Sequence, residues 1–381
     1  MKKKALMTAS VASMIDLFNM DNIHLLQSLG YEVHVAANFA FGSITSQERV
    51  DEFRTELEQD GIKTYQVPIP RSIFDWKDIM ISYRLMKKLC EEERYDLIHT
   101  QSPIGGVVAR MAAAKHRKKG TKVIYTAHGF HFFKGASLKN WLLFYPIEKF
   151  FSRYTDVLIT INQEDYARAN KFHAKRVAYV PGIGIDLEKF AALTEPETKA
   201  LRAELGFSSR DYVLLSLGQL SHRKNQETMI RAMAQIEDKA VRYLLVGAGE
   251  LEKHYRALIT ELHLENRVIL AGYRRDIPKL LHMADCFVFP SRQEGLPVSL
   301  MEAMAAGVPV ICSNIRGNTD LVTDRQEGIL VDAGDVEGFA DAIMEMKRDG
   351  NLAERCRRQA GIKIREFGRE TVQECMREIY G

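Results

Sequence analysis

The sequence predicts an α/β fold made of two doubly wound domains, each built on a parallel sheet. Short, largely apolar segments of strand-like composition alternate with longer segments of helical spacing, and the short ones do not follow an alternating apolar–polar pattern. That pattern is typical of parallel strands covered by helices on both faces. The alternation occurs twice along the chain. The length of 381 residues also suits two domains of roughly 150–200 residues each.

The strand predictions follow the apolar segments in order. In the first half, strands are expected at residues 5–10, 32–37, 63–67, 96–100, 122–126, 157–161 and 177–180. In the second half, they are expected at residues 212–217, 243–246, 268–271, 286–289, 308–312 and 329–331. Helical spacing between them is clearest at residues 76–93, 224–235, 297–306 and 334–347.

The predicted domains are residues 1–185 and 186–366, followed by a C-terminal helical segment, 367–381. Pro181, Gly182 and Gly184 stand close together at the first division, where such residues favour a linker. In the last segment, Val372 and Met376 fall on one helical face. A single-domain arrangement is the alternative.

Composition indicates a soluble, reduced protein. The chain is 46% hydrophobic and 27% charged, as globular proteins are. No apolar stretch approaches the roughly 20 residues of a spanning helix, and the N-terminus has no signal-peptide pattern. The five cysteines are scattered and lack the spacing of a disulfide framework or a zinc site. A cytosolic location is therefore expected.

Charge is divided unevenly between the two halves. Residues 1–185 carry 26 Lys+Arg against 19 Asp+Glu, a net of +7, and the remainder carries 27 against 31, a net of −4. The basic half indicates an anionic partner, such as a phosphate-bearing substrate or the anionic inner face of a membrane. Nucleic acid is not expected, because no nucleic-acid-binding motif is present.

Two glutamates mark the most informative segment of the chain. Glu294 follows the strand predicted at 286–289, and Glu302 lies about one turn inside the helix predicted from Pro297. A strand that opens through a Gly-containing loop onto a helix start is a usual ligand site in α/β sheets. Both carboxylates can face a hydroxyl-rich ligand that carries phosphate. The alternative is that both are solvated surface groups.

A second strand–turn–helix segment carries two cations. Gly218 ends the strand, and Arg223 and Lys224 stand at the start of the next helix. Adjacent cations are unfavourable at the positive end of a helix dipole, so a bound diphosphate would relieve the conflict. An exposed basic pair is the alternative. No Asp-x-Asp pair stands at a strand end, so neither a metal nor a cofactor is expected.

Three further strand ends carry candidates of weaker specificity. Residues 246–250 and Gly272–Tyr273 follow strands in the second half, and His128 follows one in the first. A Gly-x-Gly alone is a weak pattern. Tyr273 can serve in packing, and His128 can be an ordinary satisfied polar group.

Residues 130–154 are dense in aromatic side chains and cations, which is typical either of a membrane-surface segment or of a core helix with a basic edge.

The segment 289–309, together with the motifs around Gly218–Lys224, resembles the retaining glycosyltransferases of family 4. The resemblance covers most of the chain and is strongest at residues 212–332. It implies the GT-B fold, in which two Rossmann-like domains face each other across a cleft. It also implies that the helical tail crosses back onto the N-terminal, acceptor-binding domain, while the C-terminal domain binds the nucleotide sugar.

The resemblance also implies roles for single residues. Lys224, with the turn at Gly218, would hold the donor diphosphate, and Glu302 would accept hydrogen bonds from the ribose hydroxyls. Glu294 would contact the transferred sugar, and His128 would lie near the reacting carbon. The donor-binding residues that contribute mainly backbone would be Gly272, Tyr273, Gly295, Leu296, Pro297 and Val298.

The chain departs from the family pattern at two places. Gln219 stands where relatives usually have an Arg, so either Arg223 supplies that charge or the leaving group is handled with one positive charge fewer. Residues 10–16 replace the Gly-rich turn after the first strand, which leaves the acceptor side less defined.

The expected activity is metal-independent, retaining transfer from a UDP-sugar. The acceptor would be a polysaccharide or a polyprenyl-diphosphate-linked saccharide in the synthesis of exopolysaccharide or capsule. The alternatives are a nucleotide-sugar epimerase, a sugar phosphorylase, or a non-catalytic partner protein of the same fold. A dehydrogenase is disfavoured because no Gly-x-Gly-x-x-Gly follows the first strand.

Overall fold

The computed structural model describes residues 2–40, 45–190 and 194–381. The chain forms two compact units. Unit 1 comprises Met1–Ile183 and Glu370–Gly381, and unit 2 comprises Gly184–Arg369. The sequence-based divisions stood after residues 185 and 366, within three residues of these.

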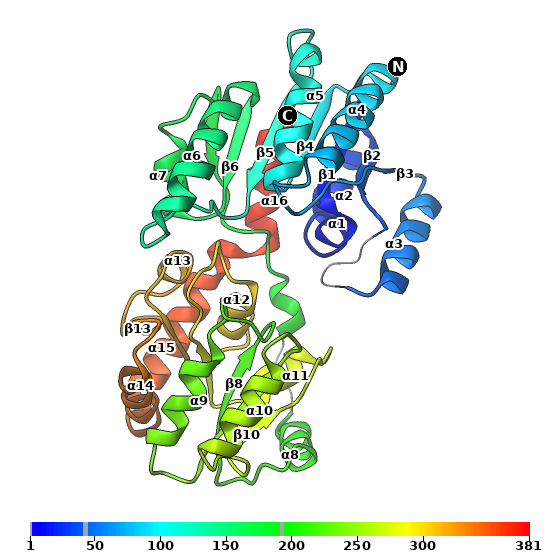
Figure 1. Ribbon diagram of the computed structural model, residues 1–381. Coiled ribbons are helices and arrows are strands. Elements are labelled where there is room, and N and C mark those ends of the chain that lie inside the picture. The colour runs from blue at the N-terminus through cyan, green and yellow to red at the C-terminus, as the bar shows by residue number, and fades with distance from the viewer. Residues whose placement is uncertain (1, 41–44, 191–193) are drawn as a thin grey trace. The chain divides into compact units, whose positions relative to one another are not determined.

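Unit 1 is built on a seven-stranded sheet in the order β3-β2-β1-β4-β5-β6-β7 (Figure 1). Every neighbouring pair runs parallel. The central strands are buried along nearly their whole length, which explains why they are largely apolar. The strands are β1 (Lys4–Val11), β2 (Glu32–Asn38), β3 (Lys63–Gln66), β4 (Leu97–Thr100), β5 (Lys122–Ala127), β6 (Val157–Thr160) and β7 (Arg176–Tyr179).

Helices connect these parallel strands. They are α1 (Ala12–Phe18), α2 (Met20–Ser28), α3 (Gln47–Gln59), α4 (Trp76–Glu93), α5 (Pro103–Arg117), α6 (Leu138–Phe151) and α7 (Gln163–Ala169). The last helix of the chain, α16 (Arg369–Tyr380), returns to unit 1. Its residues Val372, Met376, Ile379 and Tyr380 are buried in the same core as β1 and β2, as the helical spacing of the tail predicts.

Unit 2 is built on a six-stranded parallel sheet in the order β10-β9-β8-β11-β12-β13. Its strands are β8 (Tyr212–Leu217), β9 (Val241–Val246), β10 (Val268–Leu270), β11 (Cys286–Phe289), β12 (Val310–Ser313) and β13 (Gly328–Val331). Its helices are η2 (Leu187–Phe190), α8 (Glu195–Glu204), α9 (Gln226–Gln235), α10 (Glu252–Glu261), α11 (Ile277–Met283), α12 (Val298–Ala305), α13 (Asn318–Leu321), α14 (Val336–Arg348), α15 (Gly350–Lys363) and η3 (Ile364–Phe367).

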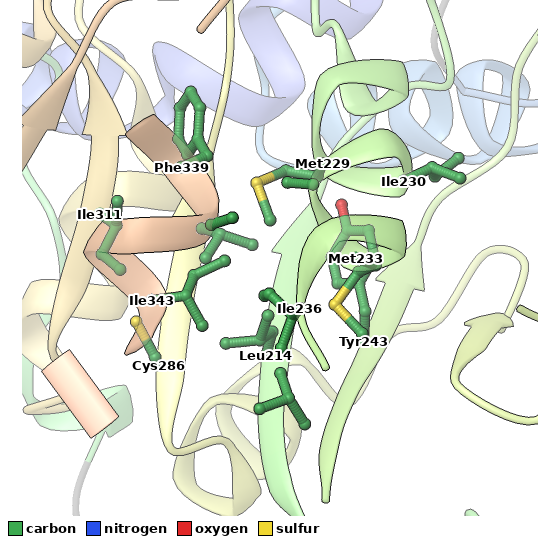
Figure 2. Packing of buried hydrophobic residues seen from close by; sticks show 14 of the residues in the cluster. Leu214, Met229, Ile230, Met233, Ile236, Tyr243, Cys286, Ile311, Phe339 and Ile343 are labelled. Atoms are coloured by element: carbon green, nitrogen blue, oxygen red, sulfur yellow. The ribbon is translucent and has the colours of Figure 1, made fainter. Parts of the chain in front are cut away.

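One face of the unit 2 sheet packs against α9 and α14 (Figure 2). Met229 and Met233 of α9 and Phe339 and Ile343 of α14 are fully buried there against the strands, including Leu214 of β8. This core fixes β8 and β11, the two strands whose ends carry the candidate site.

All thirteen predicted strands form, with ends that differ by at most two residues. The clearest correction is β12, which was expected from Val308 and begins at Val310. Val308 donates its N–H to Ala303 at the end of α12, and Pro309 has no N–H to give to a strand ladder. None of the described helices has the length and apolarity that crossing a bilayer requires.

Candidate active site

Two cations and one carboxylate meet where β8 and β11 end. The Nζ of Lys224, which follows β8, lies 2.9 Å from Oε1 of Glu294, which follows β11. Nη1 of Arg223 lies 2.9 Å from the same oxygen and donates to the main-chain oxygen of Gln293 at 3.0 Å. Because β8 and β11 are parallel neighbours, their carboxyl ends bring these loops together.

The charged groups of this cluster are largely buried, and burial shifts their pKa values. The side chain of Glu294 is 8% exposed and that of Lys224 is 12% exposed. Burial raises the pKa of Glu294, but the charges of Lys224 and Arg223 outweigh it and hold the pKa below its usual value. Burial lowers the pKa of Lys224, and Glu294 only partly opposes this. With two cations against one carboxylate, the cluster can still attract an anion.

Local backbone geometry places Lys224. A Cβ at Gly218, where φ is +146°, would lie 3.3 Å from Cε of Lys224, so the glycine gives the lysine room to cross the turn. The Nζ lies 4.6 Å from the centre of the Phe289 ring, a cation–π contact. Asn225 adopts a left-handed conformation with φ 56° and donates to the main-chain oxygen of Pro290 at 2.9 Å.

The Gly-x-Gly turn after β9 is required for close backbone packing. A Cβ at Gly247 would lie 1.9 Å from the Gly218 oxygen, and one at Gly249 would lie 2.3 Å from the Leu220 oxygen. The Gly247 N–H donates to the Gly272 oxygen at 2.8 Å. The turns after β8, β9 and β10 therefore form one connected edge. Beyond Gly272, the side chain of Tyr273 is 73% exposed.

The N-terminus of α12 has no side-chain cap. Pro297 is the N-cap residue, and the first turn contains no acidic residue. The first N–H groups of a helix have no partner within the helix, and together with the dipole they favour an anion. Leu296 and Pro297 are buried beside this end, and Gly295 and Val298 are half-buried.

Glu302 has an environment opposite to that of Glu294. It is half-buried inside α12, and no side chain of the described residues makes an ion pair or hydrogen bond with its carboxylate. Burial raises its pKa to about 7, although the charge of Lys189 opposes this. Glu294 is therefore held ionised, whereas Glu302 is near its midpoint at neutral pH.

Arg316 supports the Glu294 loop and was not among the predicted site residues. It is 7% exposed, and its Nε donates to the main-chain oxygen of Glu294 at 3.1 Å. The neighbouring Gly317 allows close approach, because a Cβ there would lie 2.4 Å from the Gly295 oxygen. Arg316 follows β12 at the same edge of the sheet as the other site residues, and this position in the sequence could have identified it.

His128 lies in unit 1, after β5. Its Nε2 donates to Oε1 of Gln101 at 2.8 Å, and Nε2 of Gln101 contacts Nε2 of His99 at 2.9 Å. Nδ1 of His99 lies 2.8 Å from the hydroxyl of Tyr380 in α16. Burial lowers the pKa of His128 to about 4, so its ring is neutral and Nε2 carries the proton.

The structure thus brings Gly218, Arg223, Lys224 and Glu294 into one cluster. Residues 295–297 continue the same loop, and Val298 begins α12. Gly272 joins the cluster through Gly247. Within the described residues, no hydrogen bond or ion pair links Glu302 or Tyr273 to the cluster. His128 belongs to the other unit.

Comparison with known proteins identifies the family. The family Glycosyl transferases group 1 matches residues 197–362, and the Glycosyl transferase 4-like domain matches residues 19–182. A Bacillus subtilis (strain 168) protein that carries the provisional name glycosyltransferase EpsD is 37% identical over 384 residues, covering 100% of this chain and 97% of its own length. The chain belongs to the group 1 glycosyltransferases.

Two further comparisons agree with this family and fold. The Escherichia coli UDP-Gal:alpha-D-GlcNAc-diphosphoundecaprenol alpha-1,3-galactosyltransferase is 32% identical to this glycosyltransferase over 77% of both chains. A crystal structure of Anabaena Alr3699/HepE in complex with UDP and glucose matches with a TM-score of 0.79 at 23% identity, covering 99% of both chains. The two parallel-sheet units and this likeness establish the expected GT-B fold.

Proposed function

We propose that this glycosyltransferase moves a sugar, with retention of configuration, from a UDP-sugar to a saccharide acceptor during the synthesis of a cell-surface polysaccharide. The Lys224–Arg223–Glu294 cluster beside the uncapped end of α12 carries the proposal. It offers two cations and free N–H groups where a diphosphate would leave. The name of the Escherichia coli relative, which states transfer from UDP-Gal to a lipid diphosphate saccharide, supports the donor and acceptor classes.

In the free protein, the positive charges of Lys224 and Arg223 are paired with Glu294. In the proposed complex, they are paired with the donor diphosphate. Lys224 and Arg223 turn toward the diphosphate, and the first N–H groups of α12 bind it from the other side. This releases the Glu294 carboxylate to accept hydrogen bonds from hydroxyls of the transferred sugar.

The remaining donor contacts follow the loops of unit 2. Glu302, when ionised, accepts two hydrogen bonds from the ribose diol, and Gly272 and Tyr273 meet the base. His128 keeps its proposed place beside the reacting carbon. Retention is ascribed to attack from the face of the leaving diphosphate, whose oxygen takes the acceptor proton.

The proposed reaction does not require a metal ion. Lys224 and Arg223 supply positive charge to the leaving diphosphate, the role that a divalent cation plays in metal-assisted phosphate chemistry. Transfer should therefore be unchanged by EDTA. A strict requirement for added Mg²⁺ or Mn²⁺ would contradict this part of the proposal.

We also propose that unit 1 associates with the anionic surface of the inner membrane. The apolar side chains of Phe74, Trp76, Leu138 and Leu142 are between 65% and 80% exposed, and Lys139 stands beside two of them in α6. Apolar side chains interleaved with cations suit an interfacial site. Sedimentation should occur with phosphatidylglycerol vesicles at low salt and not with phosphatidylcholine vesicles. Equal sedimentation with both would argue against the charge contribution.

A transfer assay tests the main proposal. The full chain is incubated with labelled UDP-sugars and a butanol-extractable lipid saccharide, and the anomeric configuration of the product is read by NMR. Label should enter the lipid fraction as an α-linked product from an α-linked donor. Inverted product would reject retention, and a change of sugar configuration without acceptor would favour an epimerase.

A further inference from the structure

A chain of buried polar side chains lies behind His128 in unit 1, and none of the donor contacts proposed above uses it. It runs from His128 through Gln101 and His99 to Tyr380. Gln101 is 2% exposed, His99 is 0% exposed and Tyr380 is 1% exposed. Burying polar groups costs free energy unless they are hydrogen-bonded. Each member of the chain therefore restricts the orientation of the next.

The first link determines which ring nitrogen of His128 carries a proton. Oε1 of Gln101 lies 2.8 Å from Nε2 of His128, and an amide oxygen can only accept a hydrogen bond. The ring is neutral, because burial lowers the pKa of His128 to about 4, and a neutral imidazole has one donor nitrogen and one acceptor nitrogen. Nδ1 is therefore the acceptor, and no group among the described residues donates to it.

The second link determines which way the amide of Gln101 faces. Its nitrogen lies 2.9 Å from Nε2 of His99 and farther from Nδ1, at 3.4 Å. Burial, and to a lesser extent the charge of His128, lowers the pKa of His99 to about 3, so a neutral Nε2 can accept from the amide. If the amide turned over, its oxygen would face this unprotonated nitrogen, and two acceptors would be in contact. His99 thus keeps the Gln101 oxygen directed at His128.

The third link connects His99 to the C-terminal helix. Because Nε2 of His99 accepts, its Nδ1 carries the ring proton, and it lies 2.8 Å from the hydroxyl of Tyr380 in α16. The hydroxyl of Thr126, which can rotate to donate, lies 2.8 Å from Nε2. Both nitrogens of His99 therefore have partners, and its ring cannot rotate without losing them.

We infer that Gln101, His99 and Tyr380 are positioning residues that hold His128 with its proton on Nε2, so that Nδ1 can accept a hydrogen bond from a hydroxyl of the ligand. The inference rests on the proposed function, in which His128 lies beside the reacting carbon. It adds three residues that act only through His128, one of which lies 281 residues from its partner in the sequence.

NMR spectra of the full chain, labelled with a nitrogen isotope at histidine, test this inference without any transfer reaction. Protonated and unprotonated ring nitrogens differ widely in chemical shift, and His128→Asn identifies the His128 signals among those of the 11 histidines. At neutral pH, the wild type should carry the proton of His128 on Nε2. A proton on Nδ1 of His128, or an equal mixture of the two tautomers, would overturn the inference.

Two buried tyrosines provide a matched pair of variants. Tyr380→Phe removes the partner of Nδ1 of His99, so His128 should become a mixture of both tautomers. Tyr95→Phe removes a hydroxyl that lies 2.9 Å from Nδ1 of His34. Tyr95 is 3% exposed and His34 is 0% exposed, and no hydrogen bond between described residues links His34 to His128. This control should leave the His128 signals unchanged. Equal changes in both variants, or none in Tyr380→Phe, would reject the positioning role.

Gln101→Met removes the amide at similar volume and gives a second, kinetic test. Transfer from the UDP-sugar should fall about tenfold, and by less in Tyr380→Phe, whereas Tyr95→Phe should keep the wild-type rate. UDP affinity should be the same in all three variants, because Lys224 and Glu294 lie in unit 2. A wild-type rate of transfer in Gln101→Met would contradict the inference.

The two measurements separate this inference from the proposed function. If His128 has the expected tautomer but the wild type transfers no sugar, the proposed function fails and the tautomer assignment survives. If the wild type transfers sugar but His128 carries its proton on Nδ1, the positioning role fails and the proposed function survives.

Discussion

At the residue scale, the two glutamates of unit 2 differ because their surroundings differ. Glu294 has two cations within 2.9 Å, whereas Glu302 is half-buried with only Lys189 opposing the effect of burial. The same side chain is therefore an ionised group in one position and a group that titrates near neutral pH in the other. Each difference leads to its own prediction.

Glu294→Gln should separate sugar transfer from nucleotide binding. Removing the carboxylate leaves the positive charge of Lys224 and Arg223 without its partner, so UDP should bind at least as tightly as before. Transfer should fall by about 100-fold, because the sugar loses a charged hydrogen-bond acceptor. Calorimetry with UDP and initial rates with the UDP-sugar measure the two effects.

The control for that variant is Glu252→Gln, which removes an exposed carboxylate paired with Arg256 in α10. It should change neither quantity. Loss of UDP binding in Glu294→Gln with unchanged sugar selectivity would contradict the assignment of Glu294 to the sugar.

Glu302 should make the stability of the ligand-free protein depend on pH. Its pKa is raised from 4.5 to about 7 in the folded state, so the folded protein holds a proton that the unfolded chain has lost between these values. Stability therefore decreases as pH rises through this window. At pH 8, Glu302→Gln should be more stable than the wild type by about 1–3 kcal/mol, and at pH 4.5 nearly equal.

Nucleotide binding should show the opposite trend. An ionised Glu302 accepts hydrogen bonds from the ribose hydroxyls, so UDP affinity should rise as pH increases through about 7. Denaturant melts and calorimetry at several pH values measure both trends. Identical pH profiles for the wild type and Glu302→Gln would show that this carboxyl does not titrate in the window.

At the element scale, the strand ends of unit 2 depend on glycines that allow backbone contact. Gly247→Ala should lower the free energy of unfolding by about 2–4 kcal/mol, since its Cβ would lie 1.9 Å from the Gly218 oxygen. Gly334→Ala is a matched control, because its Cβ would meet nothing within 4 Å. Chemical denaturation of both variants measures this difference, and similar stabilities would refute the close packing.

The elements also show what a sequence can and cannot predict. Largely apolar segments identified the central strands, because strands buried on both faces are rich in apolar residues, and the alternation with helical segments identified the more exposed edge strands β3 and β7. The ends of the strands are harder to predict, as Val308 illustrates, because a backbone N–H can donate either to a carbonyl at the end of a helix or to a neighbouring strand. Arg316 and Phe289 escaped prediction because their roles depend on the directions of side chains across neighbouring loops. The pKa of Glu302 depends on burial, which spacing does not reveal.

At the scale of the whole molecule, the C-terminal helix belongs to the core of unit 1. Val372, Met376 and Ile379 are each at most 6% exposed against that core. A chain truncated after Arg369 should therefore expose the apolar faces that these side chains cover, and unit 1 should unfold at a lower temperature. Unit 2 should still bind UDP.

Calorimetric scans with and without UDP measure the two units of the truncated chain. The result expected is an earlier transition that UDP does not affect and a later one that UDP raises. A single unchanged transition would contradict the contribution of α16 to unit 1.

The central claim is that a nucleoside diphosphate binds at the Lys224 cluster, and thermal unfolding of the full chain with UDP-, GDP- and ADP-sugars tests it most directly. A bound donor raises the Tm in proportion to the logarithm of its excess over Kd. We predict that at least one donor raises the Tm of the wild type and of Lys253→Ala, an exposed lysine in α10, but not that of Lys224→Ala. No shift with any donor, or an equal shift in Lys224→Ala, would contradict the account.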